Sequence, residues 1–266
     1  MKTLINIYAA VLSRVESLGD PKLNDWLETV RKGHPSVNYF IKKQIIANNL
    51  FGVDIMEEAT EIAKLRLFLA LVASAEIAEQ LEPLPNIDFN ILAGNSLIGM
   101  LRVDTQRFDQ RNKSESIQLD MFSAGHVKSY NDLVAEKEAA VRAYRSLQSA
   151  GTHDLQALRE SIERQREQAN ETLHNLLLEE FTNLRIQLEE ATWDAAKGKI
   201  GKPQKRSLSI QDIEDLHPFH WGYEFSEIFS RRDGFDVIIT NPPWEIFKPQ
   251  AKEFLPTTPR WSPKTT

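Results

Sequence analysis

The sequence predicts an α/β protein that holds part of a parallel sheet with a long α-helical hairpin inserted into it. Two short apolar runs, residues 50–55 and 89–93, lie on either side of a long apolar stretch of helical character. Strand, helix and strand in this order are typical of a right-handed parallel crossover unit. Hydrophobic residues recur at helical spacing over residues 131–196, and a β-branched run at residues 237–239 is typical of a buried strand.

Three helices are expected before the first strand. Leu4, Ile7 and Val11 begin a series of apolar residues at helical spacing, and a Gly-Asp-Pro sequence at residues 19–21 ends it. Two further stretches of helical character follow. The three expected helices cover residues 4–18, 22–31 and 37–48.

The first expected strand carries an acid, Asp54, near its end. The helix that follows, over residues 57–79, is too apolar for a surface helix and should lie against a sheet. Prolines then stop the helix, and the strand at residues 89–93 leads into Gly94-Asn95-Ser96-Leu97.

The middle of the chain has two different characters. Residues 100–130 have weak hydrophobic periodicity and no strong preference for helix or strand. Residues 131–150 and 154–196 predict two helices that form an antiparallel hairpin standing off the sheet, with its charges on solvated faces. Residues 197–206 contain glycine, proline and several basic residues, which favours an exposed flexible return that could also contact a phosphate backbone.

The composition excludes several classes of protein. The chain has 266 residues and no cysteine, so it has no disulfides or thiolate metal sites, and we expect a cytoplasmic protein. No apolar run reaches membrane-spanning length, and no signal peptide is recognised, so no membrane partner is expected. The net charge of −6 means that a nucleic-acid-binding surface would be local or would lie outside this chain; we favour the second.

The most informative residues are Asn241, Pro242, Pro243 and Trp244, directly after the run at residues 237–239. Proline has no N–H to donate, so the strand must end there in a stiff loop. Open α/β sheets bind their ligands at the carboxyl ends of strands. An amide side chain, a free carbonyl and an aromatic ring at that place can accept hydrogen bonds from an amino group and stack on the ring that carries it. A structural Asn-Pro turn is the alternative interpretation.

Asn241-Pro242-Pro243-Trp244 resembles the catalytic tetrapeptide of S-adenosylmethionine-dependent amino-methyltransferases, above all the DNA adenine-N6 enzymes. The resemblance implies a partial Rossmann-like methyltransferase sheet and S-adenosylmethionine as the cofactor. It implies that the Asn241 side chain and the Pro242 carbonyl accept hydrogen bonds from the adenine N6 amino group. Trp244 would stack on an adenine flipped out of double-stranded DNA.

The resemblance also suggests cofactor-binding residues. The strand and helix at residues 50–71 resemble the family's second strand and its helix, which places Asp54 and Ile55 at the cofactor ribose. Asp54 could instead cap the following helix. Asn95 lies in a loop that resembles the one near the cofactor adenine, although a Gly-Asn-Ser turn needs no ligand to explain it.

His217-Pro218-Phe219-His220-Trp221 resembles a stretch of the large, fused restriction–modification methyltransferases of the type IIG, Eco57I-like kind. Two histidines three residues apart could suggest a metal site. Without cysteines or a further histidine nearby, we expect a packed aromatic turn and no metal.

The family's glycine-rich cofactor turn and its first strand are not found before Asp54, nor is a target-recognition region found later. We therefore expect an incomplete methyltransferase that is inactive alone, either because a second chain supplies the strand and turn or because the chain is a remnant. Its expected parts are a cofactor-binding α/β part, a helical hairpin with a basic linker, a catalytic strand with its loop, and a disordered tail. They cover residues 1–130, 131–206, 207–248 and 249–266 respectively.

Two other functions remain open from the sequence. A protein-glutamine N5 methyltransferase uses a similar Asn-Pro-Pro-aromatic loop, but the insertion at residues 131–197 fits the large DNA enzymes better. A non-catalytic interaction module built on the helical hairpin is the second. Such a module would not depend on Asn241 or Trp244, whereas catalysis would.

Overall fold

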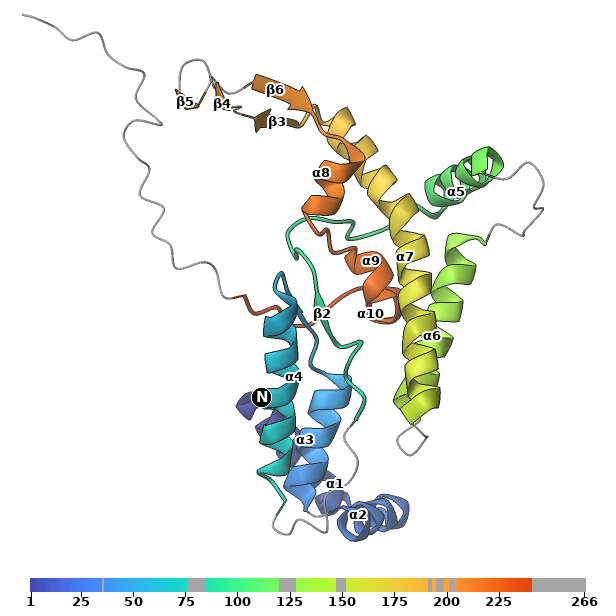
Figure 1. Cartoon of the computed structure of the whole chain (residues 1–266). Helices are drawn as coiled ribbons and strands as arrows, with labels where there is room; N and C mark the ends of the chain where they lie inside the picture. Colours follow the sequence, from blue (N-terminus) through green and yellow to red (C-terminus); the bar gives the residue numbers. More distant parts are fainter. Residues whose placement is uncertain are drawn as a thin grey trace, which may run out of the picture.

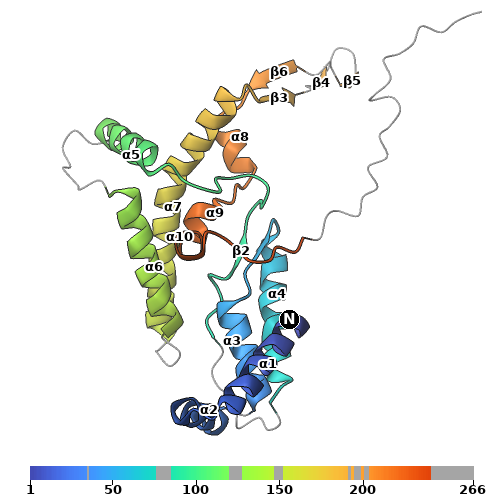
Figure 2. The same ribbon diagram turned by 180° about the vertical axis from the view of Figure 1, so that it is seen from behind.

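The computed structural model describes residues 1–34, 36–75, 85–119, 128–146, 152–190, 193–194, 199–200 and 204–240. Within these residues, an N-terminal group of helices and a small sheet lies beside a second group of helices (Figure 1). Residues 85–104, which contain β2, run between the two groups in both views (Figures 1 and 2). None of the described helices combines the length and the apolar character that spanning a membrane demands.

The three N-terminal helices form as the spacing of their apolar residues predicts. Gly19 ends the first helix in the left-handed conformation, with φ 66°. The side chain of Asp20 caps the second helix, and that of Ser36 caps the third. Their shared core is built from Leu12, Leu27, Ile41 and Ile45. The helices are α1 (Lys2–Leu18), α2 (Pro21–Gly33) and α3 (Val37–Asn48).

The sheet at the centre of the N-terminal part has two parallel strands, β1 (Gly52–Asp54) and β2 (Ile91–Ala93). Helix α4 (Glu57–Val72) connects them, so the predicted parallel crossover unit is present. The side chain of Asn90 donates hydrogen bonds to the carbonyls of Ala47, at 2.9 Å, and Leu50, at 3.3 Å. This buried amide therefore fixes the end of α3 against the start of β2.

The second group contains α5 (Thr105–Leu119), α6 (Tyr130–Ser146) and α7 (Thr152–Asn183). Helices α6 and α7 lie side by side (Figures 1 and 2). Phe108 and Leu173 are fully buried between these helices. The sequence did not predict α5, because its apolar positions are too few to give a clear period.

The helical group packs against β2 and α9 through one buried and two partly buried cations, so it does not stand off the core as predicted. Lys137 on α6 donates to the carbonyls of Tyr223 and Glu224, and burial lowers its pKa to about 8. Arg166 on α7 pairs with the Glu224 carboxylate and donates to the Ala93 carbonyl at the end of β2. Arg145 donates to Asn90 at 2.7 Å.

The predicted helix over residues 154–196 is wrong in its last part. Helix α7 ends at Asn183. Two residues later, Arg185 adopts a left-handed conformation with φ 56°, so the helix does not continue. An antiparallel ribbon then replaces both the expected helix end and part of the expected flexible return. Ladder pairing satisfies backbone groups that a loop would leave to solvent. The ribbon consists of β3 (Gln187–Glu190) paired with β6 (Gln204–Ser207), and β4 (Trp193–Asp194) paired with β5 (Lys199–Ile200).

The predicted buried strand at residues 237–239 is also wrong for the described structure. These residues form no strand, and Val237, Ile238 and Ile239 are 76%, 74% and 90% exposed. A strand forms only where a neighbour completes its hydrogen-bond ladder, and no described strand pairs with this segment.

Three short helices precede this segment: α8 (Ile210–Asp215), α9 (Trp221–Glu224) and α10 (Ser226–Arg232).

The loop after β2 interlocks with the His-Pro-Phe-His-Trp segment. The Phe219 N–H donates to the Ile98 carbonyl at 2.7 Å, and the Gly222 N–H donates to the Met100 carbonyl at 3.1 Å. Gly99 has φ 140°, and a Cβ there would lie 2.1 Å from the Phe219 carbonyl oxygen. Only glycine therefore allows the two segments to come this close.

This contact predicts opposite effects for two glycine substitutions. Gly99→Ala should lower the free energy of unfolding by about 2–4 kcal/mol, because it adds both a backbone clash and positive-φ strain. Gly33→Ala, in helix α2 with no atom within 4 Å of the added Cβ, should raise it by about 0.5 kcal/mol. Urea unfolding followed by circular dichroism measures both. Equal effects would contradict the interlock.

Candidate functional site

The sequence-predicted cofactor residues meet at one edge of the sheet. The parallel register places Asp54 opposite Ala93, and the Gly94 N–H donates to the Asp54 carbonyl at 2.8 Å. Asp54 and Ile55 therefore lie beside the loop that contains Asn95. This is the carboxyl end of both strands, where parallel sheets bind ligands.

Asp54 closes the turn that leads into α4 and keeps one oxygen free for a ligand. Its Oδ1 accepts a hydrogen bond from the Met56 N–H at 2.9 Å. The N-terminal cap position of α4 is Met56, which makes no side-chain cap. Asp54 is exposed, and its second carboxylate oxygen has no partner among the described residues. Ile55, 60% exposed, adds an apolar surface beside it.

Asn95 fixes the loop onto the segment at residues 217–219. Its N–H donates to the His217 carbonyl at 2.7 Å, and its backbone forms a parallel bridge with Pro218. Its side-chain Oδ1 accepts from the Leu97 N–H at 3.2 Å, which forms the local turn. The amide nitrogen of the side chain is the group left to donate to a ligand.

An aromatic cluster connects the sheet to the segment that precedes the tetrapeptide. The ring centroids of Phe51 and Phe235 are 5.7 Å apart, and those of Trp221 and Phe235 are 5.9 Å apart. Trp221 also donates its indole N–H to the Ser96 carbonyl at 3.0 Å. Phe235 is therefore anchored beside the start of β1. The density of aromatic residues between Phe219 and Phe235 is the sequence signal for this anchor.

The tetrapeptide itself, Asn241, Pro242, Pro243 and Trp244, lies outside the described residues. The described chain reaches Thr240. The structure therefore brings together Asp54, Ile55 and Asn95, and it fixes the chain a few residues before the tetrapeptide.

His220 supports the loop after β2 as a buried neutral imidazole. Its Nδ1 accepts from the Met100 N–H at 3.3 Å, and its ring lies 5.2 Å from that of His174. Burial, followed by the charges of His174 and Arg166, lowers the pKa of His220 to about 3. Within the described ranges, no group of three or more side chains could hold a metal ion. His220 is therefore part of a packed turn.

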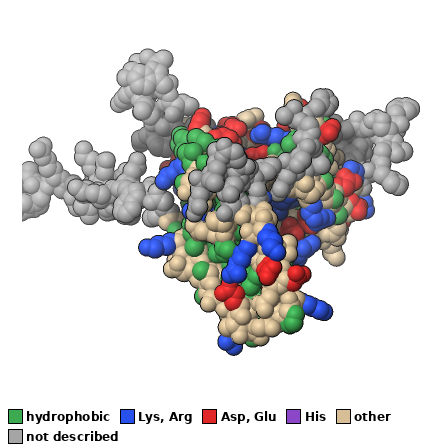
Figure 3. Space-filling model, turned by 90° about the horizontal axis from the view of Figure 1, so that it is seen from below, with side chains coloured by type: hydrophobic (Ala, Val, Ile, Leu, Met, Phe, Trp, Pro, Cys, Tyr) green, Lys and Arg blue, Asp and Glu red, His purple; other side chains and the backbone are tan. Residues whose placement is uncertain are grey.

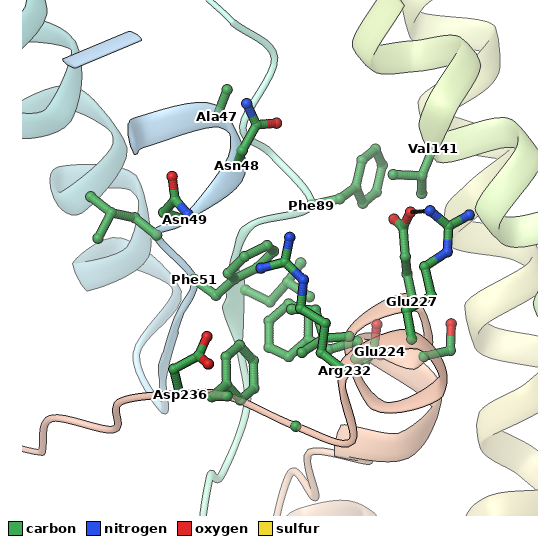
Figure 4. Close-up of a pocket in the computed structure, with 18 of the residues that line it drawn as sticks. Ala47, Asn48, Asn49, Phe51, Phe89, Val141, Glu224, Glu227, Arg232 and Asp236 are labelled. Atoms are coloured by element: carbon green, nitrogen blue, oxygen red, sulfur yellow. Dashed lines mark ion pairs between the residues drawn. The ribbon is translucent and has the colours of Figure 1, made fainter. Parts of the chain in front are cut away.

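A cavity of about 690 Å³ lies at the other end of β1 (Figure 4). Phe51, Phe225 and Phe235 form an apolar part of its lining, and α10 contributes Glu227 and Arg232. Asp54, Ile55 and Asn95 do not line it. The cavity is therefore separate from the sheet edge where Asp54, Ile55 and Asn95 lie.

The buried imidazole predicts a pH dependence of stability. The pKa of His220 is about 3 in the folded chain, whereas an unfolded histidine titrates near pH 6.5. The unfolded state therefore binds more protons between these values, and the free energy of unfolding should fall as the pH drops from about 6.5 to 3.

We expect His220→Gln to remove about 3–4 kcal/mol of this fall. His34→Gln, outside this turn, is the matched control and should keep the wild-type slope. Urea unfolding at a series of pH values measures the slopes. An unchanged slope in His220→Gln would contradict the buried, neutral state.

The comparisons with known proteins agree with this architecture. The family model described as Eco57I restriction-modification methylase matches residues 48–259. A Methanocaldococcus jannaschii protein named "Putative type II restriction enzyme and methyltransferase" is 31% identical over 237 residues, which is 82% of this chain and 20% of that protein. The chain thus spans about a fifth of the relative's length. No solved structure matches. The chain belongs to the Eco57I restriction-modification methylase family.

Proposed function

We propose that this chain provides part of the catalytic domain of a site-specific DNA methyltransferase in a restriction–modification system. The reaction is transfer of a methyl group from S-adenosylmethionine to adenine N6. The observation that carries the proposal is the meeting of Asp54 and Asn95 at the carboxyl end of β1 and β2, together with the anchoring, at the start of β1, of the segment that leads to Asn241. Membership of the methylase family supports it.

The residues at the sheet edge fit the cofactor. The exposed second oxygen of Asp54 can accept hydrogen bonds from ribose hydroxyls, as a carboxylate at a strand end does in nucleotide-binding sheets. Ile55 offers apolar contact to the adenine ring, and the Asn95 amide can donate to its nitrogens. S-adenosylmethionine supplies an activated methyl group when bound.

The anchored segment can bring the tetrapeptide to the same edge. An extended chain advances about 3.3 Å per residue, so the six residues from Phe235 to Asn241 span at most about 20 Å. From Phe51 to Asp54, β1 covers about 10 Å. Since Phe235 lies against Phe51, Asn241 is within reach of the cofactor end.

The chemistry of the tetrapeptide suits an aromatic amine. An amino group conjugated to a purine is a weak nucleophile, and two acceptors on its hydrogens return electron density to nitrogen. The Asn241 side chain and the Pro242 carbonyl are these acceptors. Trp244 stacks on the base, which must leave the duplex to reach the pocket. Pro243 keeps the loop stiff.

The DNA-binding surface is proposed to lie mainly outside this chain. The face seen from below carries Lys, Arg, Asp and Glu side chains together, with hydrophobic ones between them (Figure 3). A surface that grips the phosphate backbone is normally rich in basic residues. A net charge of −6 agrees with this division of roles.

The cofactor role of Asp54 predicts a selective loss of donor binding. Asn keeps the acceptor for the Met56 N–H but removes the carboxylate charge, so Asp54→Asn should fold normally. The purified chain should bind S-adenosylmethionine weakly, with ribose signals in saturation-transfer NMR that fall at least about fivefold in Asp54→Asn. Asp25→Asn, exposed on α2, is the control. Ribose signals of equal size in Asp54→Asn and Asp25→Asn, or no ribose signal in the wild-type chain, would contradict the proposal.

The catalytic role of Asn241 is best tested in a complete enzyme. In a chimera, this chain replaces the matched segment of the Methanocaldococcus jannaschii relative, and nucleosides of the treated DNA are analysed by mass spectrometry. We expect N6-methyladenine, reduced at least about 100-fold by Asn241→Ala, because the amine loses an oriented acceptor. Asn24→Ala on α2 is the control. Methylated cytosine, or no product from a folded chimera, would contradict adenine-N6 transfer.

A further inference from the structure

A single peptide group, between Ala93 and Gly94, is held from two sides at the sheet edge that carries Asp54 and Asn95. Its N–H donates to the Asp54 carbonyl at 2.8 Å. Its C=O accepts from the Arg166 guanidinium on α7 at 3.4 Å. Because the N–H and C=O of a trans peptide point in opposite directions, Arg166 holds this group from the side opposite to Asp54. The next residue in the chain is Asn95.

Gly94 is the residue at which the chain turns from β2 toward Asn95. Its φ is 154°, and a Cβ there would lie 2.9 Å from a ring carbon of Phe219. Glycine is therefore required, but glycine also restricts its own backbone least. The direction in which the chain leaves β2 thus depends on contacts of the neighbouring peptide groups. The His217 carbonyl holds the Asn95 N–H, and Arg166 holds the peptide group before it.

The guanidinium of Arg166 is itself held in one orientation. Its Nε donates to the Glu224 carboxylate at 2.5 Å, and the Glu224 side chain is only 7% exposed. The buried Lys137 amine also donates to the Glu224 carbonyl, so a second cation already lies at this end of α9. Neutralising Glu224 therefore does not by itself explain an arginine. A planar guanidinium has donors in fixed directions, and here two of them reach Glu224 and Ala93 at the same time.

We propose that Arg166 is a positioning residue for the cofactor. By holding the peptide group between Ala93 and Gly94, it sets the spacing between the Asp54 carboxylate and the Asn95 amide, and it does so without touching the ligand. Binding groups must be held to within about 0.5 Å, so a residue behind the sheet edge can control affinity. The identity of the ligand as S-adenosylmethionine rests on the proposed function. Helix α7 thus contributes to cofactor binding.

Arg166→Lys separates this positioning role from charge pairing. Lysine keeps a positive charge beside Glu224, but its single nitrogen cannot occupy the places of both guanidinium donors. We expect the Gly94 amide to exchange with deuterium at least about fivefold faster in the variant, while amides in the middle of α7 stay protected. Arg164→Lys, exposed on the same helix, is the matched control. Hydrogen exchange of the purified chain, followed by NMR without cofactor, measures both.

Cofactor binding is then measured on the same variants by saturation-transfer NMR with S-adenosylmethionine. We expect the ribose and adenine signals to fall at least about threefold in Arg166→Lys and to keep their wild-type size in Arg164→Lys. A role limited to neutralising Glu224 predicts no fall, because lysine supplies the same charge. Glu224→Gln loosens the guanidinium but leaves it an acceptor, so a smaller fall is expected; this variant keeps the test decisive if Arg166→Lys fails to fold.

Two results would overturn the positioning role. One is unchanged exchange of the Gly94 amide in Arg166→Lys, and the other is faster exchange with cofactor signals equal to those of the wild type. A wild-type chain that gives no cofactor signal would instead contradict the proposed function. Exchange at Gly94 would still decide whether Arg166 holds the peptide group, because that measurement needs no cofactor.

Discussion

The close contact between the loop after β2 and the segment at residues 217–222 is the constraint on which the rest of the structure depends. Main-chain hydrogen bonds from Asn95, Phe219 and Gly222 connect segments more than a hundred residues apart in the chain. The contact sets the position of Asn95 beside Asp54, and it places Trp221 where it helps to hold Phe235. One local interlock thus positions both the sheet edge that carries Asp54 and Asn95 and the segment that leads to the tetrapeptide.

The helical group stabilises this interlock from behind. Lys137 and Arg166 hold the carbonyls and the carboxylate at the end of α9, while Arg166 and Arg145 reach the strand β2 and its entry. Burying a cation costs free energy unless it is paired, and here carbonyls and a carboxylate pair with Lys137 and Arg166. The helices between the two parallel strands and the segment that leads to the tetrapeptide are therefore part of the scaffold.

The sequence predicted those parts whose cause is local. The helices at residues 4–18 and 37–48, the two parallel strands and the placement of Asp54 follow from hydrophobic period and from turn residues. The ribbon after α7 and the state of residues 237–239 were mispredicted, because both depend on which strand lies alongside. The anchoring role of Phe235 was missed for the same reason, since it requires Phe51 and Trp221 to meet in space.

Hydrogen–deuterium exchange of the purified chain tests the central claim most directly, because it reads the interlock amide by amide. We predict that the amides of Asn95, Phe219 and Gly222 exchange as slowly as those in the middle of α7, whereas the amides of residues 237–240 exchange at once. Fast exchange at Asn95, Phe219 and Gly222, with α7 still protected, would show that the helices fold without the interlock and would contradict the account.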